Sequence, residues 1–328
     1  MNQLAAALNH VPKTDLGLFP TPLHRLKNLE RDLKFQEIFI KRDDLNGLGP
    51  GGNKVRSLEF ILGETLSLGS DTVIVYGPLQ SNLCTLTACA CAKLSLKCIT
   101  IHNAEPPEEV EGNLLLNKLL DVESLYVGAI SSEDRNHFAL ELAEKLKLEG
   151  KNPYIVENGG TTGVGALGYV SGCLELAAQV KERNLPIRSL FAPGGNGGVA
   201  AGLIYGNALL GRPFEIIIIS VEHDSRTLAN EIKKAIAQVE KVLDLPFNHQ
   251  LEDVCRLVDD YRGLGWGANT AASEGFVHRL PQLEGIFIEN IYTSKVLVGL
   301  EDFVAKDYVK KGICYLHTGG LGSLFSQY

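Results

Sequence analysis

A single lysine, Lys54, stands between a glycine-rich turn and a run in which apolar residues recur at helical spacing. The turn contains Gly49, Gly51 and Gly52, and the apolar run begins at Val55. A lysine amine becomes a nucleophile when its surroundings lower its pKa, and it then forms Schiff bases with carbonyl compounds. The alternative interpretation is a solvent-exposed lysine at the start of a helix, so the choice between them depends on the rest of the chain.

A second glycine-rich stretch has four glycines in the five positions 194–198, with Asn196 between them. It follows a predicted strand and opens a predicted helix. Glycines allow backbone N–H groups to surround an anion, and the start of a helix adds partial positive charge. Because the lysine and hydroxyl of a nucleotide-binding P-loop are missing, the stretch predicts a phosphate site without a magnesium nucleotide. Close packing of helix on sheet at a tight turn is the alternative.

Three polar residues, Gln80, Ser81 and Asn82, follow another predicted strand and precede an alanine-rich segment. Ligands in α/β proteins bind at the carboxyl ends of strands, so this trio could receive a substrate carboxylate. A helix N-cap at Ser81 or Asn82 would explain the same residues. Residues 159–163 and 317–320 also join glycines to hydroxyl or imidazole side chains, which is typical of backbone that approaches a ligand.

The segments that must position these residues alternate between strand-like and helix-like patterns, apart from residues 1–35, which we expect to be irregular. This order predicts an α/β fold with two open, twisted, mainly parallel sheets flanked by helices. We expect a smaller inserted α/β domain at 48–164, a large domain formed by 1–47 and 165–328, and the active site in the cleft between them. Strands are predicted at 37–41, 72–76, 97–102, 124–127, 153–156, 189–192, 214–221, 286–289 and 313–317. Helices are predicted to begin at Lys54 and to span 83–94, 132–148, 165–183, 198–210, 226–243 and 294–311.

Composition narrows the class of protein. The chain has 31 basic and 39 acidic residues, a net charge of −8, and no long run of one sign, which argues against a nucleic-acid partner. Without a membrane-length apolar stretch or a signal-like start, we expect a soluble, cytoplasmic protein with no membrane partner. The seven cysteines lack metal-site spacing and are interpreted as buried free thiols, and the histidines predict no metal site. His317 alone is more typical of a core or capping histidine.

Several of these stretches, in this order, resemble one family: the fold type II (tryptophan synthase β-type) pyridoxal phosphate enzymes, in the branch of D-cysteine desulfhydrase and 1-aminocyclopropane-1-carboxylate deaminase. The resemblance runs from about residue 19 to the end of the sequence. The matching segments are residues 51–54 with Arg56 and 58–59, then 80–82, 165–170, 195–203, 284–285, 292–295 and 317–320.

The resemblance implies pyridoxal 5′-phosphate as cofactor, held by Lys54 through a Schiff base, with the same lysine as the proton-transferring base. It also implies a small amino acid substrate and a homodimer. The implied catalytic residues are Lys54, Ser81 and Tyr292. The implied cofactor-binding residues are Lys54, Asn82, Gly195, Asn196, Gly197, Gly198, Val199 and Thr318. The implied substrate residues are Gln80, Ser81, Asn82, Thr161, Trp266 and Thr293.

Two threonines point to one activity within the branch. Where the deaminase has a glutamate and a leucine, this chain has Thr293 and Thr318, as in the desulfhydrase. A neutral hydroxyl cannot hold a proton on the cofactor ring nitrogen as a carboxylate can, and loss of a thiolate needs less electron withdrawal than opening a cyclopropane. The resemblance therefore implies a lyase that converts D-cysteine to pyruvate, ammonia and hydrogen sulfide.

Other activities stay open at this stage. They are 1-aminocyclopropane-1-carboxylate deamination, elimination from L-cysteate or D-serine, racemisation, and a catalytically weak protein that only binds the cofactor or an amino acid. An anion-binding α/β protein without cofactor is the last alternative. The departures that motivate the weak-enzyme alternative are Leu83, Val199 and Trp266, which replace the family's usual histidine, threonine and tyrosine; Asn196 also replaces a usual serine.

Overall fold

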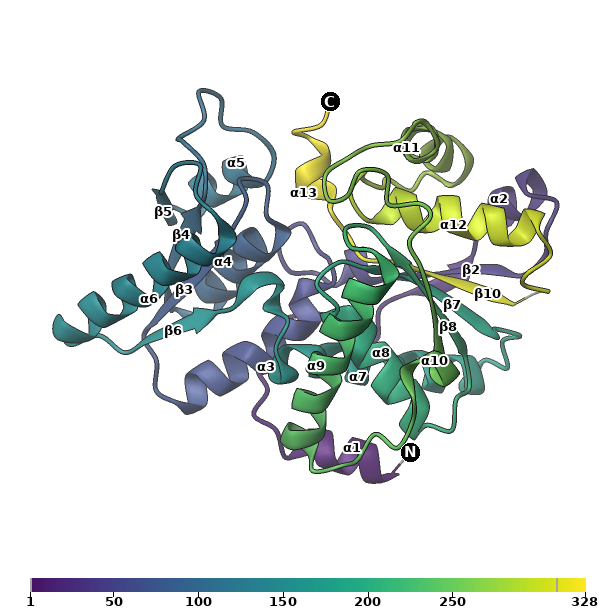
Figure 1. Ribbon diagram of the computed structural model, residues 1–328, viewed down its shortest axis with the longest axis horizontal. Helices are drawn as coiled ribbons and strands as arrows, with labels where there is room; N and C mark the ends of the chain where they lie inside the picture. The colour runs from purple at the N-terminus through teal and green to yellow at the C-terminus, as the bar shows by residue number, and fades with distance from the viewer. Residues whose placement is uncertain (1, 311) are drawn as a thin grey trace.

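Two β-sheets organise the chain in the computed structural model, which describes residues 2–310 and 312–328 (Figure 1). The larger sheet has six strands in the order β1-β2-β10-β7-β8-β9, and the smaller has four in the order β5-β4-β3-β6. Every pairing is parallel except β1 with β2. The prediction of two mainly parallel, helix-flanked sheets is therefore confirmed. The strands are β1 (Leu23–Arg25), β2 (Ile38–Arg42), β3 (Thr72–Gly77), β4 (Lys97–His102), β5 (Glu123–Tyr126), β6 (Pro153–Val156), β7 (Ser189–Gly194), β8 (Glu215–Ser220), β9 (Cys255–Val258) and β10 (Ile313–His317).

Helices cover both sheets, and in Figure 1 the smaller sheet with α4, α5 and α6 lies on the left of the molecule. The helices are α1 (Asn2–Asn9), α2 (Lys27–Asp32), α3 (Lys54–Ser67), α4 (Asn82–Leu94), α5 (Gly112–Leu119), α6 (Ser132–Leu148), α7 (Gly163–Glu182), α8 (Gly198–Leu209), α9 (Ser225–Leu243), α10 (Leu251–Val254), α11 (Ala271–Glu284), α12 (Thr293–Ala305) and α13 (Leu321–Leu324). Within the described residues, no helix combines the length and apolarity that crossing a bilayer requires.

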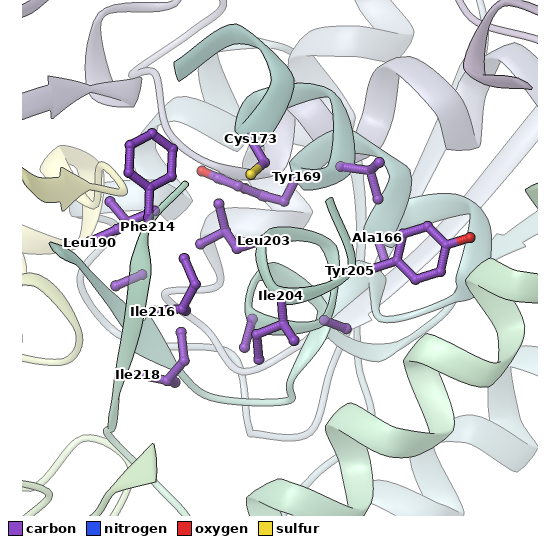
Figure 2. Packing of buried hydrophobic residues seen from close by; sticks show 14 of the residues in the cluster. Ala166, Tyr169, Cys173, Leu190, Leu203, Ile204, Tyr205, Phe214, Ile216 and Ile218 are labelled. Carbon is purple, nitrogen blue, oxygen red and sulfur yellow. The ribbon is translucent and has the colours of Figure 1, made fainter. Parts of the chain in front are cut away.

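Strand β8 shows why the large sheet is buried on both faces. Ile216 and Ile218 pack with α7, α8 and α9 in one cluster, which Figure 2 shows from close by. Ile217 and Ile219 point the other way and pack with α11 and α12. Since successive strand residues face opposite sides, an unbroken isoleucine run is what a strand between two helix layers requires.

The sequence predictions were wrong at several elements. Residues 1–35 are not simply irregular, because they contain α1, β1 and α2. Elements α5, α11 and β9 were not predicted either. Residues 286–289 form no strand. Ile286 and Ile288 are buried in a core cluster, so their alternation reflects packing without a backbone ladder. Helix α12 also ends at Ala305, earlier than the predicted 311.

The domain boundaries at 47/48 and 164/165 stay a prediction. All four strands of the smaller sheet fall inside the segment 48–164, and every strand of the larger sheet falls outside it.

Candidate active site

A cavity of about 290 Å³ lies where the carboxyl ends of strands from both sheets meet. Segments after β3, β4, β6, β7, β8 and β10 contribute to its wall. This is the crevice in which open α/β sheets bind ligands, because helix N-termini and strand-end loops converge there. The lining residues used below are Lys54, Gln80, Ser81, Asn82, Asn103, Ser132, Arg135, Asn158, Thr161, Gly195, Asn196, Gly197, Gly198, Val199, Glu222, Trp266, Glu289, Tyr292 and Thr318.

Lys54 is the first residue of α3 and reaches into this cavity. Its Nζ donates to the Gly159 carbonyl oxygen at 2.6 Å, and burial lowers the pKa of Lys54 to about 8. The turn before it is fixed by a bridge between Gly52 and Gly319 and by Asn53 N donating to Thr318 O at 2.9 Å. The interpretation of Lys54 as a solvent-exposed lysine is therefore wrong, and its amine is partly neutral near physiological pH.

Buried charges anchor α3 behind the lysine. Arg56 lies two residues after Lys54 and pairs with Asp43 at 2.8 Å and with Glu175 at 2.8 Å. Lys41 of β2 also pairs with Glu175. The Arg56 guanidinium lowers the pKa of Asp43 against the opposing effect of burial. These contacts join β2, α3 and α7, so the helix that carries Lys54 has a defined position relative to the large sheet.

The glycine-rich loop between β7 and α8 also lines the cavity. Gly197 has φ = +88°, a backbone conformation that favours glycine. It precedes α8 without any side-chain cap hydrogen bond, so the first N–H groups of the helix are not satisfied by a cap. A Cβ on Gly198 would lie 3.2 Å from Thr161 Oγ1, which shows how closely two cavity-lining loops approach. This arrangement suits an anionic group.

The polar residues Gln80, Ser81 and Asn82 after β3 line the cavity, and Ser81 also caps a helix, as the two interpretations of the sequence suggested. Ser81 caps α4, with Cys84 N donating to its Oγ at 3.3 Å. The Asn82 Oδ1 accepts from Asn113 Nδ2 at 2.8 Å, and the Gln80 Oε1 accepts from Asn113 N at 2.8 Å. The Asn82 amide group uses its oxygen in the contact with Asn113, so its nitrogen is left to donate into the cavity that Ser81 and Asn82 both line.

Tyr292 is held by the chain's single tryptophan. Trp266 Nε1 donates to Tyr292 Oη at 2.7 Å, and burial raises the pKa of Tyr292, which keeps the phenol protonated. The loop that carries Trp266 is tied down by Lys295, whose Nζ donates to Arg262 O at 2.8 Å and to Gly265 O at 3.0 Å. A buried ammonium thus holds the loop through backbone carbonyls.

Glu289 is a buried carboxylate in the cavity wall that the sequence analysis did not identify. Its oxygens accept from the backbone N–H groups of Ile291 at 2.6 Å, Tyr292 at 3.0 Å and Thr293 at 2.7 Å. The Thr293 hydroxyl donates to the same carboxylate at 2.8 Å. Burial raises the pKa of Glu289, and these hydrogen bonds oppose that shift. Glu289 therefore sets the conformation of the turn that carries Tyr292.

Almost all of the sequence-predicted site residues meet in this cavity. Thr293 differs, since it is fully buried and its hydroxyl is bonded to Glu289; within the described chain it is not part of the cavity wall. Residues that sequence reasoning missed include Asn103, Arg135, Asn158, Glu222 and Glu289. Asn103 directly follows a predicted strand and Glu289 ends one, so the rule used for Gln80 could have found both. Arg135 lies inside a helix and gave no such signal.

His317 is a core histidine, as its isolated position suggested. Its Nε2 lies 2.9 Å from Phe287 O, and Gly319 N donates to its Nδ1 at 3.1 Å. Burial lowers the pKa of His317, so the neutral ring with a proton on Nε2 satisfies both partners. The seven cysteines are free thiols, five of them buried. Among the described residues, no group of three or more His, Cys, Asp or Glu side chains is placed to hold a metal ion.

Known proteins resemble this chain over nearly its whole length. A family model described as pyridoxal-phosphate dependent enzyme matches residues 14–319. The chain is 35% identical over 320 residues to a putative 1-aminocyclopropane-1-carboxylate deaminase of Pyrococcus abyssi, covering 98% of this chain and 95% of the relative. It is also 35% identical over 328 residues to a D-cysteine desulfhydrase of Klebsiella pneumoniae, covering 98% of each. A crystal structure of a homologue of 1-aminocyclopropane-1-carboxylate deaminase superposes with a TM-score of 0.91 at 33% identity, covering 99% of this chain and 97% of that one.

Proposed function

Because the chain belongs to the family of pyridoxal-phosphate-dependent enzymes, we propose that it is a lyase that converts D-cysteine and water to pyruvate, ammonia and hydrogen sulfide. The observation that carries the proposal is Lys54, an amine with a lowered pKa in the same cavity as an uncapped, glycine-rich helix start.

The residues of the cavity fit the cofactor. Lys54 supplies an amine for the aldehyde, and the loop from Gly195 to Val199 supplies backbone N–H groups for a phosphate. Asn82 would donate to the phenolic oxygen, and Thr318 would complete the contacts. When bound, pyridoxal phosphate withdraws electrons from the substrate's α-carbon, which makes loss of the α-proton possible.

The chain's own groups divide the remaining work. Ser81 and Asn82, at the start of α4, bind the substrate carboxylate. Lys54 Nζ takes the α-proton, a role that its pKa of about 8 suits because the neutral amine is well populated near neutral pH. Tyr292, kept protonated by burial and oriented by Trp266, can donate its hydroxyl proton to the departing sulfur. Gln80 and Thr161 line the same cavity and would contact the substrate.

Thr293 supports the desulfhydrase activity, because a hydroxyl there leaves the cofactor ring nitrogen without the carboxylate of the deaminase. Thr318, which stands where the deaminase has a leucine, agrees with the same activity. Deamination of 1-aminocyclopropane-1-carboxylate is the second candidate. Glu289 favours it, since this carboxylate lines the cavity directly beside Thr293 and could supply a negative charge there.

The test begins with the absorbance spectrum of the purified protein. We expect a visible band that borohydride abolishes, with the reduced cofactor found on Lys54 by mass spectrometry and absent in Lys54→Ala. The holoenzyme is then given D-cysteine, L-cysteine and 1-aminocyclopropane-1-carboxylate in parallel. Sulfide from D-cysteine supports the proposal; oxobutyrate without sulfide replaces it with the deaminase; a bound cofactor with no product from either substrate contradicts both.

The finer parts of the assignment are also proposals. A homodimer in the cytoplasm, with the domain division at 48–164, fits the family resemblance. Light scattering coupled to size-exclusion chromatography tests the dimer, and a mass of one chain, 35.6 kDa, would contradict it.

A further inference from the structure

Arg135 is a buried arginine in the wall of the active-site cavity that no carboxylate neutralises. Only 2% of it is exposed, and it lines the cavity beside Asn103 and Asn158. Its Nη atoms contact the side-chain oxygens of these two asparagines, the second at a long 3.4 Å. Its Nε has no hydrogen-bond partner within the described residues. A buried guanidinium normally has a carboxylate or phosphate partner, because its desolvation is otherwise uncompensated.

The groups around Arg135 compensate its positive charge only weakly. The ring of Tyr76 lies below its Cζ at 5.3 Å, and the two asparagine oxygens are neutral. In the described part of the chain Arg135 forms no ion pair, in contrast to Arg56, which has two carboxylates. Burial lowers the pKa of Arg135, which is the direction expected of a cation without a counter-charge. The Arg135 guanidinium is therefore a hydrogen-bond donor whose charge a bound anion would compensate.

The start of α6 adds positive potential at the same place. Arg135 lies in the first turn of this 17-residue helix, and the first helical residue, Ser132, also lines the cavity. A helix N-terminus carries partial positive charge and therefore favours anions. An arginine in the first turn is repelled by this charge unless a bound ligand supplies negative charge. Glu133 and Asp134 share this turn, but both are exposed to solvent.

This cluster is separate from the groups assigned to the substrate carboxylate. Ser81 and Asn82 belong to α4, which follows β3, whereas Asn103 follows β4 and Asn158 follows β6. Since β4 and β6 flank β3 in the small sheet, the strand-end residues on both sides of the trio contact Arg135. The cavity therefore offers two helix starts, α4 and α6, to one bound molecule.

We propose that Arg135 and the start of α6 form a second anion subsite, which binds the sulfur group on the β-carbon of the substrate where that group carries or develops negative charge. Within the proposed elimination, on which this inference rests, that group takes the electrons of the Cβ–S bond as it leaves: a thiol leaves as hydrosulfide and a sulfonate leaves as sulfite. Arg135 then determines specificity, because it favours substrates whose β-carbon carries an ionised or readily ionised group, a sulfonate or a thiol, over those, such as D-serine, whose hydroxyl stays neutral.

A binding experiment with the holoenzyme tests the subsite without turnover. Methanesulfonate and its neutral analogue methanesulfonamide are titrated while the melting temperature is followed. We expect methanesulfonate, and not the amide, to raise the melting temperature of the wild type; Arg135→Gln should lose this shift and Arg135→Lys should keep part of it. Ser81→Ala serves as the matched control and should keep it. A shift that persists in Arg135→Gln, or that is equal for both compounds in the wild type, overturns the proposal.

Kinetics provide the second readout. In Arg135→Gln we expect KM for D-cysteine, and for D- or L-cysteate where these react, to rise at least 10-fold, with KM for D-serine changed less than 2-fold. An equal rise for the neutral substrate would make Arg135 a structural residue. The two hypotheses fail separately: methanesulfonate binding that depends on Arg135, without sulfide release, contradicts the proposed function alone. Sulfide release with an unchanged KM in Arg135→Gln contradicts the subsite alone.

Discussion

The ionisation of Lys54 leads to a quantitative prediction for the cofactor-free protein. Burial lowers the pKa of Lys54 to about 8, whereas a lysine in water has a pKa of about 10.4. At pH 7.5 about a quarter of the Lys54 amines would then be neutral, compared with about 0.1% for an unperturbed lysine. Because only the neutral amine is nucleophilic, the reactive fraction is about 200-fold higher.

Competitive trace labelling with acetic anhydride measures this directly. The cofactor-free protein is labelled at a series of pH values, and peptide mass spectrometry gives the relative rate at each lysine. For Lys54 we expect the rate to rise with pH and to level off above about pH 8, since a lowered pKa moves the neutral form to lower pH. The exposed Lys27 provides the internal standard for reagent reactivity.

One result would refute the reasoning. If the rate at Lys54 continues to rise beyond pH 10, its surroundings do not favour the neutral amine, and burial is not what prepares this residue for chemistry. A low labelling rate of Lys54 at every pH could result from restricted access of the reagent to the cavity. Small reagents reach a cavity more readily than large ones, so access can be tested separately. Repeating the labelling with a bulkier acylating reagent distinguishes restricted access from an unshifted pKa.

Three substitutions test the contacts that position the site. Arg56→Met should lower the free energy of unfolding by about 3–5 kcal/mol in urea titrations, because it leaves buried carboxylates unpaired, whereas the exposed Arg31→Met should change it by less than about 0.5 kcal/mol. Lys295→Met should release the loop of Trp266, shift the emission of this single tryptophan to longer wavelength and increase its quenching by acrylamide; unchanged emission would show that the carbonyl contacts do not hold the loop. Glu289→Gln should cost roughly 2–3 kcal/mol in guanidinium titrations, since an amide nitrogen replaces one oxygen that accepts backbone N–H groups, and an unchanged midpoint would contradict that role.

The sequence predicts the regular parts of the fold well because their signals are local. The isoleucines of β8 and the alternation around it require a strand between two helix layers, and the structure has this arrangement. The run at 286–289 is also short and largely apolar, yet within the described chain it has no strand partner. Whether a run pairs with a neighbour depends on residues distant in the chain, so no local pattern separates these two cases.

The residues of the site also fall into those that a local pattern predicts and those that it does not. Glycine loops and strand-end polar residues mark their own positions, which is why Lys54, Ser81 and Gly197 could be placed from the sequence. Arg135 could not, because an arginine in the first turn of a helix is usually an exposed residue, and its importance depends on which loops surround it. Glu289 illustrates a third case: its neighbour Thr293 was interpreted as facing the substrate, whereas the fold turns that hydroxyl toward the buried carboxylate.

The position of β10 in the larger sheet has a consequence for biosynthesis. It is the last strand along the described chain, yet it pairs with β2 on one side and β7 on the other. Until residues 313–317 leave the ribosome, β1-β2 and β7-β8-β9 are two separate pieces, and the Gly52–Gly319 bridge behind Lys54 cannot form. The lysine is translated early, but its binding site is complete only after residues 313–319 have been made. We therefore expect ribosome-bound chains from which residues 313–319 have not yet emerged to lack high-affinity cofactor binding, with the small sheet as the unit that can fold earlier.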